Sequence, residues 1–128
     1  MILNGIAASG LGKAKQFTEL AWVQAELTQK LGIRPHPGTF NVRLTESDQL
    51  EKWAALKRAP GIPIEEPAGS SCVAVCYRVL VNEAVPGAIL IPGVPAYPAD
   101  QVEIVARESV RGTVGVKDGD PITLRVLD

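Results

Sequence analysis

The sequence predicts a mainly β protein of the α+β kind: six short strands in a small closed or partly closed barrel, with two helices packed outside. Three observations lead to this fold class. Six segments have the short apolar or alternating pattern of strands. The twelve glycines and ten prolines are spread along the chain, which suits short strands joined by turns better than long helices. Two stretches in the N-terminal half have helical spacing.

The first elements are a strand and a helix. Leu3–Ser9 is expected to form the strand, followed by a glycine-containing loop. A helix is expected from Thr18 to Leu31, with Thr18 as its cap and Gly32 as its end. Its apolar face is formed by residues three or four positions apart: Leu20, Val23, Leu27 and Leu31.

The next segment alternates between apolar and polar residues, which is typical of a half-buried strand. Phe40, Val42 and Leu44 form the apolar side, and Thr39, Asn41 and Arg43 form the polar side. A second helix is expected over Ser47–Arg58, where Asp48 with Glu51 resembles a capping box and Leu50 shares a side with Trp53. The following stretch, Ala59–Gly69, contains three prolines and is expected to be a loop.

The C-terminal half is expected to supply the remaining four strands. They are Cys72–Asn82, Gly87–Ile91, Gln101–Ala106 and Ile122–Leu127. A turn at Lys117-Asp118-Gly119-Asp120 leads into the last of them. The chain of 128 residues has the length of one domain, so we expect a single domain over residues 1–128.

Composition and charge exclude several classes of protein. The formal net charge is -1, which disfavours a protein that coats nucleic acid. No apolar run reaches the ~18 residues of a membrane span, and no secretory signal is visible, so no membrane partner and a cytoplasmic location are expected. The sequence leaves the oligomeric state open.

The cysteines and the histidine do not indicate a catalytic or zinc site. On a strand, Cys72 and Cys76 lie ~13 Å apart along one face, too far for a disulfide, and both are expected to be small core or wall residues. One histidine with two cysteines cannot assemble a four-ligand zinc site from these residue types alone. His36, between two prolines, is expected to be a loop residue and not a catalyst.

Two segments carry residue types suited to nucleotide chemistry. In Gly10-Leu11-Gly12-Lys13-Ala14-Lys15, the glycines allow the backbone N–H groups to approach a phosphate, and the two lysines add positive charge. The alternative is a plain glycine turn, since the spacing is neither that of a P-loop nor that of a Rossmann motif.

The second segment is Pro37-Gly38-Thr39-Phe40-Asn41. Residues two apart on a strand face the same way, so the Thr39 hydroxyl and the Asn41 carboxamide present two oxygen donors of the kind that Mg²⁺ accepts. Two neutral ligands hold the ion weakly, so it is expected to arrive with a nucleotide. The alternative is a solvent-facing polar strand.

Together these segments resemble a known family. The strings SGLGKAKQF, LGIRPHPGTFNVRL, AILIP, YPADQVEIVA and VGVKDGD occur in the order and spacing of the archaeal-type CTP-dependent riboflavin kinases, formerly a domain of unknown function. The resemblance runs from about Leu3 to Val126. It implies a six-stranded cradle-loop barrel and an enzyme that transfers the γ-phosphoryl group of CTP to the riboflavin 5′-hydroxyl, giving FMN and CDP.

The resemblance also implies roles for individual residues. Gly10 to Lys15 would wrap the nucleotide phosphates, and Thr39 and Asn41 would be magnesium ligands. Glu103 would contact the flavin, orient the acceptor and conceivably accept its proton. A second nucleotide-binding stretch near the base would comprise Ser109, Val110, Arg111 and Gly112.

Pro95 stands where the family has a threonine that contacts the flavin. Proline offers neither a hydroxyl nor an N–H group, so the sequence matches the family better at the phosphate and metal elements than at the acceptor elements. Two alternatives follow: a kinase for a different small alcohol, or a barrel of the same fold that binds a nucleotide or flavin without catalysis. A DNA-binding barrel with a similar Lys-Asp-Gly-Asp turn is disfavoured by the slightly acidic charge balance.

Overall fold

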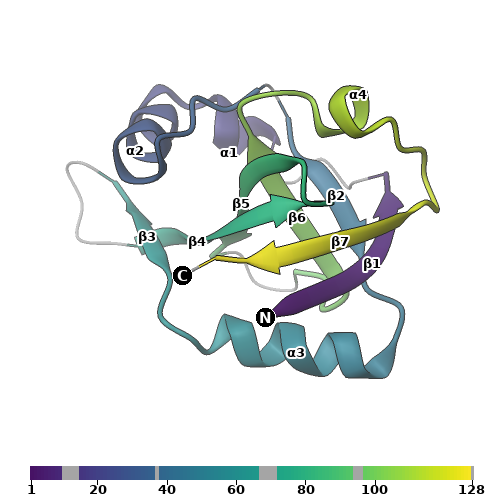
Figure 1. The fold of residues 1–128 in the computed structure, drawn as a ribbon. Helices are drawn as coiled ribbons and strands as arrows, with labels where there is room; N and C mark the ends of the chain where they lie inside the picture. The colour runs from purple at the N-terminus through teal and green to yellow at the C-terminus, as the bar shows by residue number, and fades with distance from the viewer. Residues whose placement is uncertain (10–14, 37, 67–71, 94–96, 128) are drawn as a thin grey trace.

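Six strands close into a barrel in the computed structural model, which describes residues 1–9, 15–36, 38–66, 72–93 and 97–127 (Figure 1). All strand pairs are antiparallel, in the order β3-β4-β5-β6-β2-β1-β7, and an additional pairing of β4 with β7 closes the barrel. The strands are β1 (Ile2–Ala8), β2 (Phe40–Arg43), β3 (Ile62–Glu65), β4 (Cys72–Val81), β5 (Val85–Pro92), β6 (Gln101–Ala106) and β7 (Pro121–Val126). The six predicted strands are therefore confirmed, with ends shifted by no more than two residues.

The strand β3 corrects the prediction of a loop over Ala59–Gly69. It lies outside the closed barrel and pairs only with the first half of β4. Pro63, within this strand, accepts a hydrogen bond at its carbonyl from the Lys30 side chain at 2.7 Å. Proline is tolerated on such an edge strand because its missing N–H group need not take part in the ladder.

The barrel has two apolar layers, one inside it and one on its outer face. The inner cluster draws on every barrel strand, with Leu3, Val42, Val79, Ile89, Ile104 and Leu124 all buried. The outer cluster forms where helix α2 (Ala21–Leu31) covers the sheet; it joins Val23, Leu27 and Leu31 to Ala88, Leu90 and Val105. Because side chains alternate along a strand, residues such as Ala88 and Leu90 face this second layer while Ile89 between them faces the barrel interior.

The predicted first helix is divided into α1 (Lys15–Glu19) and α2. Leu20 has extended backbone angles between them and is 45% exposed, so the expectation that it belongs to the buried face is wrong. Thr18 lies buried within α1 and does not cap α2. Gly32 does end α2, with a positive φ of 68°; its N–H donates to the Thr28 carbonyl, and the Ile33 N–H donates to the Leu27 carbonyl.

The second predicted helix is α3 (Ser47–Lys57), which lies across one end of the barrel (Figure 1). Trp53 lies in the inner cluster and Leu50 packs against it, as their shared side predicts, and Leu56 also belongs to this cluster. The helix begins after Glu46, and the described structure shows no side-chain hydrogen bond capping it. The expected capping box of Asp48 with Glu51 is therefore wrong. None of the described helices is long and apolar enough to cross a membrane.

The last segment before β7 contains a short helix, α4 (Val110–Val114), that the sequence analysis did not predict. The turn at Lys117–Asp120 is confirmed: Gly119 has a φ of 91°, and its N–H donates to the carbonyl of Ala7 at 2.7 Å. This bond, with the one from the Ala7 N–H to the Asp120 carbonyl at 2.8 Å, fixes the turn against the end of β1. The chain after β1 and the chain before β7 are thereby held together.

We expect Gly5→Ala to destabilise the barrel by about 1–3 kcal/mol, the usual cost of overpacking a core. A Cβ atom at Gly5 would lie 2.6 Å from the Arg43 carbonyl and 2.8 Å from Val42 Cγ1, and the backbone there cannot move without disturbing the β1–β2 pair. Urea unfolding at an unchanged m-value measures the loss. Gly112→Ala is the matched control, since its Cβ would make only ordinary contacts at 3.4 Å or more. Equal stability of the two variants would contradict the expectation.

Candidate functional site

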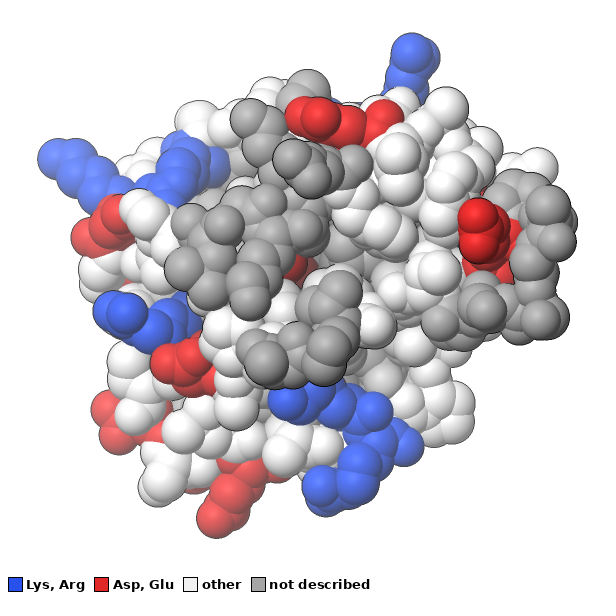
Figure 2. Space-filling model, turned by 180° about the vertical axis from the view of Figure 1, so that it is seen from behind, with Lys and Arg blue, Asp and Glu red and all other residues white. Residues whose placement is uncertain are grey.

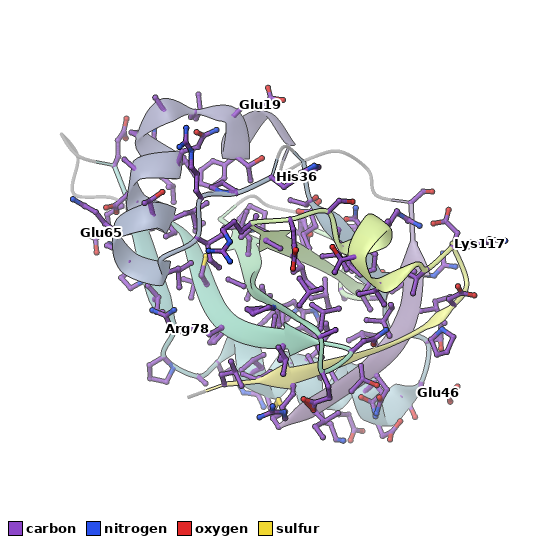
Figure 3. The ribbon with its side chains drawn as sticks, turned by 45° about the horizontal axis from the view of Figure 1, so that its top comes forward. Glu19, His36, Glu46, Glu65, Arg78 and Lys117 are labelled. Carbon is purple, nitrogen blue, oxygen red and sulfur yellow. The ribbon has the colours of Figure 1, made fainter. Side chains whose placement is uncertain are left out.

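An open pocket lies beside the end of β1, where residues from four parts of the chain meet. It is lined by Ala8, Ser9, Thr39, Asn41, Arg111, Val116, Lys117 and Asp118. The strand pair β1–β2 brings Ala8 opposite Asn41, and the turn before β7 adds the last two residues. Figure 3 shows Lys117 beyond α4, at this edge of the barrel. The pocket therefore contains two cationic side chains, one carboxylate, the Ser9 hydroxyl bonded to that carboxylate, and two further neutral oxygen donors.

A second pocket adjoins the first and shares Thr39 and Arg111 with it. Its other lining residues include His36, Phe40, Ile104, Glu108, Ser109 and Val110. Figure 3 shows His36 in the connection between α2 and β2, on the side of α4 that faces the helices α1 and α2. This arrangement gives a continuous surface: a partly apolar hollow against α4, and a polar hollow at the end of β1.

Asn41 is buried, with 7% of its surface exposed, so the expectation of a solvent-facing polar strand is wrong at this residue. The Asn41 Oδ1 atom accepts a hydrogen bond from Gln101 Nε2 at 2.8 Å. A carbonyl oxygen has two lone pairs, so this bond leaves one lone pair for a cation.

The donor chemistry at Thr39 and Asn41 fits Mg²⁺ bound together with a phosphate ligand. Both residues line one pocket and offer a hydroxyl and a carboxamide oxygen. The described residues contain no group of three or more His, Cys, Asp and Glu side chains placed to hold a metal. An ion held at this pocket would therefore depend on oxygens from its ligand.

Glu103 lies directly opposite Asn41 in the β2–β6 ladder, so the two side chains share the outer face of the sheet. It is only 1% exposed. Tyr97 lies near the same carboxylate: burial first, then the charge of Glu103, raise the pKa of the tyrosine hydroxyl far above its usual range. Tyr97 is therefore neutral at physiological pH and can donate its proton to the Glu103 carboxylate.

The predicted stretch Ser109–Gly112 forms the start of α4. The Ser109 hydroxyl accepts a hydrogen bond from the Gly112 N–H at 3.2 Å and so caps the helix. Val110 is buried in the inner cluster, while Arg111 lies 5.6 Å above the Phe40 ring. Of these four residues, Arg111 is the one that lines both pockets.

Some of the predicted site residues cannot be placed. Gly10, Leu11, Gly12, Lys13, Ala14 and Pro95 lie outside the described residues, and Lys15 is the first residue of α1. Ser9 and Ala8, which directly precede the glycine segment, line the same pocket as Thr39 and Asn41. Cys76 is buried in the outer cluster, as expected, and the His36 N–H donates to the Ala106 carbonyl at 2.7 Å in a loop.

Five polar residues at or beside the site were not among the predicted site residues: Ser9, Tyr97, Gln101, Lys117 and Asp118. Gln101 reaches Asn41 through the pairing of β2 with β6, and a long-range strand register cannot be read from local patterns. The Lys-Asp-Gly-Asp sequence predicts the turn that contains Asp118, but it does not indicate that the Asp118 carboxylate reaches the pocket. Figure 2 shows that acidic and basic side chains are interspersed over the rear face, so surface charge alone does not mark the site.

Comparison with known proteins gives one consistent family. Residues 7–126 match the family of CTP-dependent riboflavin kinases, described as domain of unknown function DUF120. A riboflavin kinase of Aeropyrum pernix is 34% identical over 99% of this chain and 96% of its own length. One from Saccharolobus solfataricus is 28% identical over 97% of this chain and 73% of its own length.

Other relatives are longer than this chain. A riboflavin kinase of Methanoregula boonei is 33% identical over 97% of this chain, which spans only 56% of that relative. The matched region in all three includes the barrel strands and both pockets. The chain therefore belongs to the CTP-dependent riboflavin kinase family.

Proposed function

We propose that this protein is a riboflavin kinase that transfers the γ-phosphoryl group of CTP to the 5′-hydroxyl of riboflavin, giving FMN and CDP, with Mg²⁺. The observation that carries the proposal is the pocket at the end of β1, in which Thr39 and Asn41 meet Arg111 and Lys117. Membership of the family supports the same reaction.

The two adjoining pockets suit the two ends of a nucleotide. The hollow formed by Phe40, Ile104 and Val110 is suited to a flat base, and the polar hollow beyond Thr39 is suited to phosphates. Arg111 and Lys117 offset phosphate charge there, and Thr39 and Asn41 would hold Mg²⁺. When bound, the ion neutralises charge on the phosphate oxygens.

Glu103 is suited to the acceptor side of the reaction. Its buried carboxylate lies beside Asn41, so an alcohol bound next to the phosphate pocket can donate a hydrogen bond to it. In the reaction the riboflavin hydroxyl oxygen bonds to the γ-phosphorus, the bond from that phosphorus to the β–γ bridging oxygen breaks, and CDP leaves. The hydroxyl proton passes to Glu103 or to solvent. The chain supplies position and charge, on which phosphoryl transfer mostly depends.

Ligand-induced stabilisation tests this proposal. We expect CTP with Mg²⁺ at 100 times its dissociation constant to stabilise the fold by about 2.7 kcal/mol, with ATP giving less. Thermal unfolding with each nucleotide, with and without Mg²⁺ and riboflavin, measures this. Conversion of riboflavin to FMN with release of CDP is then followed by chromatography. Absence of stabilisation by CTP with Mg²⁺ would count against the proposal, and binding without FMN formation would favour a non-catalytic barrel.

A further inference from the structure

The carboxylate of Asp118 connects two segments that border the polar pocket. Its Oδ2 atom accepts a hydrogen bond from Ser9 Oγ, and its Oδ1 atom accepts one from Arg111 Nη2, both at 2.5 Å. Ser9 is the last described residue before the glycine segment, and Arg111 lies on α4. One side chain of the turn before β7 therefore ties the end of β1 to α4.

These contacts determine how the Arg111 guanidinium is oriented. Nη2 donates both to Asp118 and to the Ala8 carbonyl at 3.0 Å, and the guanidinium lies over the Phe40 ring. Within the described part of the chain, Nε and Nη1 have no hydrogen-bond partner. Because the guanidinium is planar and rigid, fixing one of its nitrogens and its ring contact sets the direction of the other N–H groups. Arg111 lines both pockets.

A carboxylate is an unexpected neighbour for a phosphate site, because it repels the ligand's negative charge. The Asp118–Arg111 pair is also exposed, with side chains 53% and 40% accessible, and exposed ion pairs contribute little to stability. Hydrogen bonds from Ser9 and Arg111 lower the pKa of Asp118, so the group remains charged at neutral pH. Neither ligand attraction nor fold stability accounts for it, whereas orientation of Arg111 and Ser9 does.

We propose that Asp118 is a positioning residue of the nucleotide site: it holds Arg111 and Ser9 so that the unoccupied guanidinium N–H groups meet the phosphate oxygens of the nucleotide. This inference rests on the proposed function, since it needs a phosphate ligand in the pocket. Asp118 itself does not touch the ligand, and its effect passes through Arg111 and Ser9.

The chain offers a matched control for the loss of this ion pair. Glu83 pairs with Arg125 in a similarly exposed contact, with side chains 57% and 44% accessible, and neither residue lines the two pockets. We expect Asp118→Asn to weaken CTP–Mg²⁺ binding about tenfold, as misplacement of a positioned group does, and Glu83→Gln to leave it unchanged. Isothermal titration measures both, and thermal unfolding should show similar small shifts for the two variants. The KM for riboflavin should remain at the wild-type value in both.

A double-mutant cycle separates positioning from a general structural role. In an Arg111→Ala background the carboxylate has no guanidinium to hold; it keeps its contact with Ser9 and still repels phosphate. Asp118→Asn is therefore expected to cost clearly less CTP affinity there than in the wild type. Ser9→Ala removes the hydrogen bond from Ser9 to Asp118 and keeps the Asp118–Arg111 ion pair. It should therefore reduce CTP affinity less than Asp118→Asn does.

The outcomes are distinguishable. If the wild type binds neither CTP nor another nucleoside triphosphate with Mg²⁺, the proposed function fails and this inference fails with it. If the wild type binds CTP but Asp118→Asn binds it equally well, or loses the same factor in both backgrounds, only the positioning role is overturned. If Asp118→Asn does not fold, an unchanged affinity in Ser9→Ala overturns the proposal.

Discussion

Asn41→Leu is expected to reduce turnover by about 100-fold and to raise the Mg²⁺ concentration needed for half-maximal activity. Leucine has a similar volume but no oxygen, so the pocket would keep only the Thr39 hydroxyl as a neutral donor for the ion. Initial rates of FMN formation over a Mg²⁺ titration, at saturating CTP and riboflavin, measure both effects. A rate that recovers in part at high Mg²⁺ is the expected signature of a lost ligand.

The same substitution carries a stability cost that must be separated from the loss of activity. Asn41 accepts from Gln101 Nε2, and removing the acceptor leaves this half-buried donor without its partner, at a cost of about 1 kcal/mol. Gln101→Leu is the control, because it removes the same hydrogen bond and keeps the Asn41 oxygen. We expect Gln101→Leu to lose stability and to keep its Mg²⁺ dependence. Equal losses of activity in the two variants would mean that Asn41 acts only through the fold.

The barrel could be predicted because its strands carry local signals. Alternation along Phe40–Arg43 and β-branched residues along Cys72–Val81 mark strands without any knowledge of their partners. The strand β3 could not be predicted in this way, since Pro63 removes an N–H group and breaks the usual pattern. What makes that strand possible is its place at an edge, where the Lys30 side chain bonds the Pro63 carbonyl.

The sequence predicts which residue types form the site, but it does not predict how they are arranged in space. Alternation correctly placed Thr39 and Asn41 on the polar side of the β2 segment, but it cannot show that Asn41 is buried there, because burial depends on segments that are distant in the sequence. The pairing of Asn41 with Glu103 depends on a register between segments about 60 residues apart. Asp118 shows the same limit: its partner Ser9 is 109 positions away.

Glu103→Gln is expected to lower kcat by about 100-fold, the usual contribution of a positioned acid or base, and to leave the CTP dissociation constant unchanged. The amide keeps the shape of the side chain but cannot accept a proton, and it accepts a hydrogen bond from an alcohol more weakly than a carboxylate does. Single-turnover rates with CTP and riboflavin measure the chemical step, and isothermal titration measures CTP binding.

The Glu103→Gln substitution should not lower the thermal stability of the protein, although it lowers the activity. A carboxylate that is 1% exposed is costly to bury, so replacing it by a neutral amide is expected to raise the thermal midpoint or leave it unchanged. Glu51→Gln, on the exposed side of α3, is the control and should alter neither quantity. A fall in both kcat and thermal midpoint for Glu103→Gln would mean that Glu103 stabilises the fold and does not act on the acceptor.

Substitution of Tyr97 provides an independent test of the role of the Glu103 carboxylate. The Tyr97 hydroxyl has a raised pKa, chiefly through burial and then through the nearby Glu103 charge, so it stays protonated through neutral and mildly alkaline pH. Tyr97→Phe removes a hydroxyl that can donate to the Glu103 carboxylate, and a carboxylate with one donor fewer is a stronger base. If Glu103 accepts the hydroxyl proton, the acidic limb of the pH–rate profile should shift to higher pH in Tyr97→Phe and disappear in Glu103→Gln. If Glu103 only orients the acceptor, both variants should keep the wild-type shape of the profile at a reduced rate.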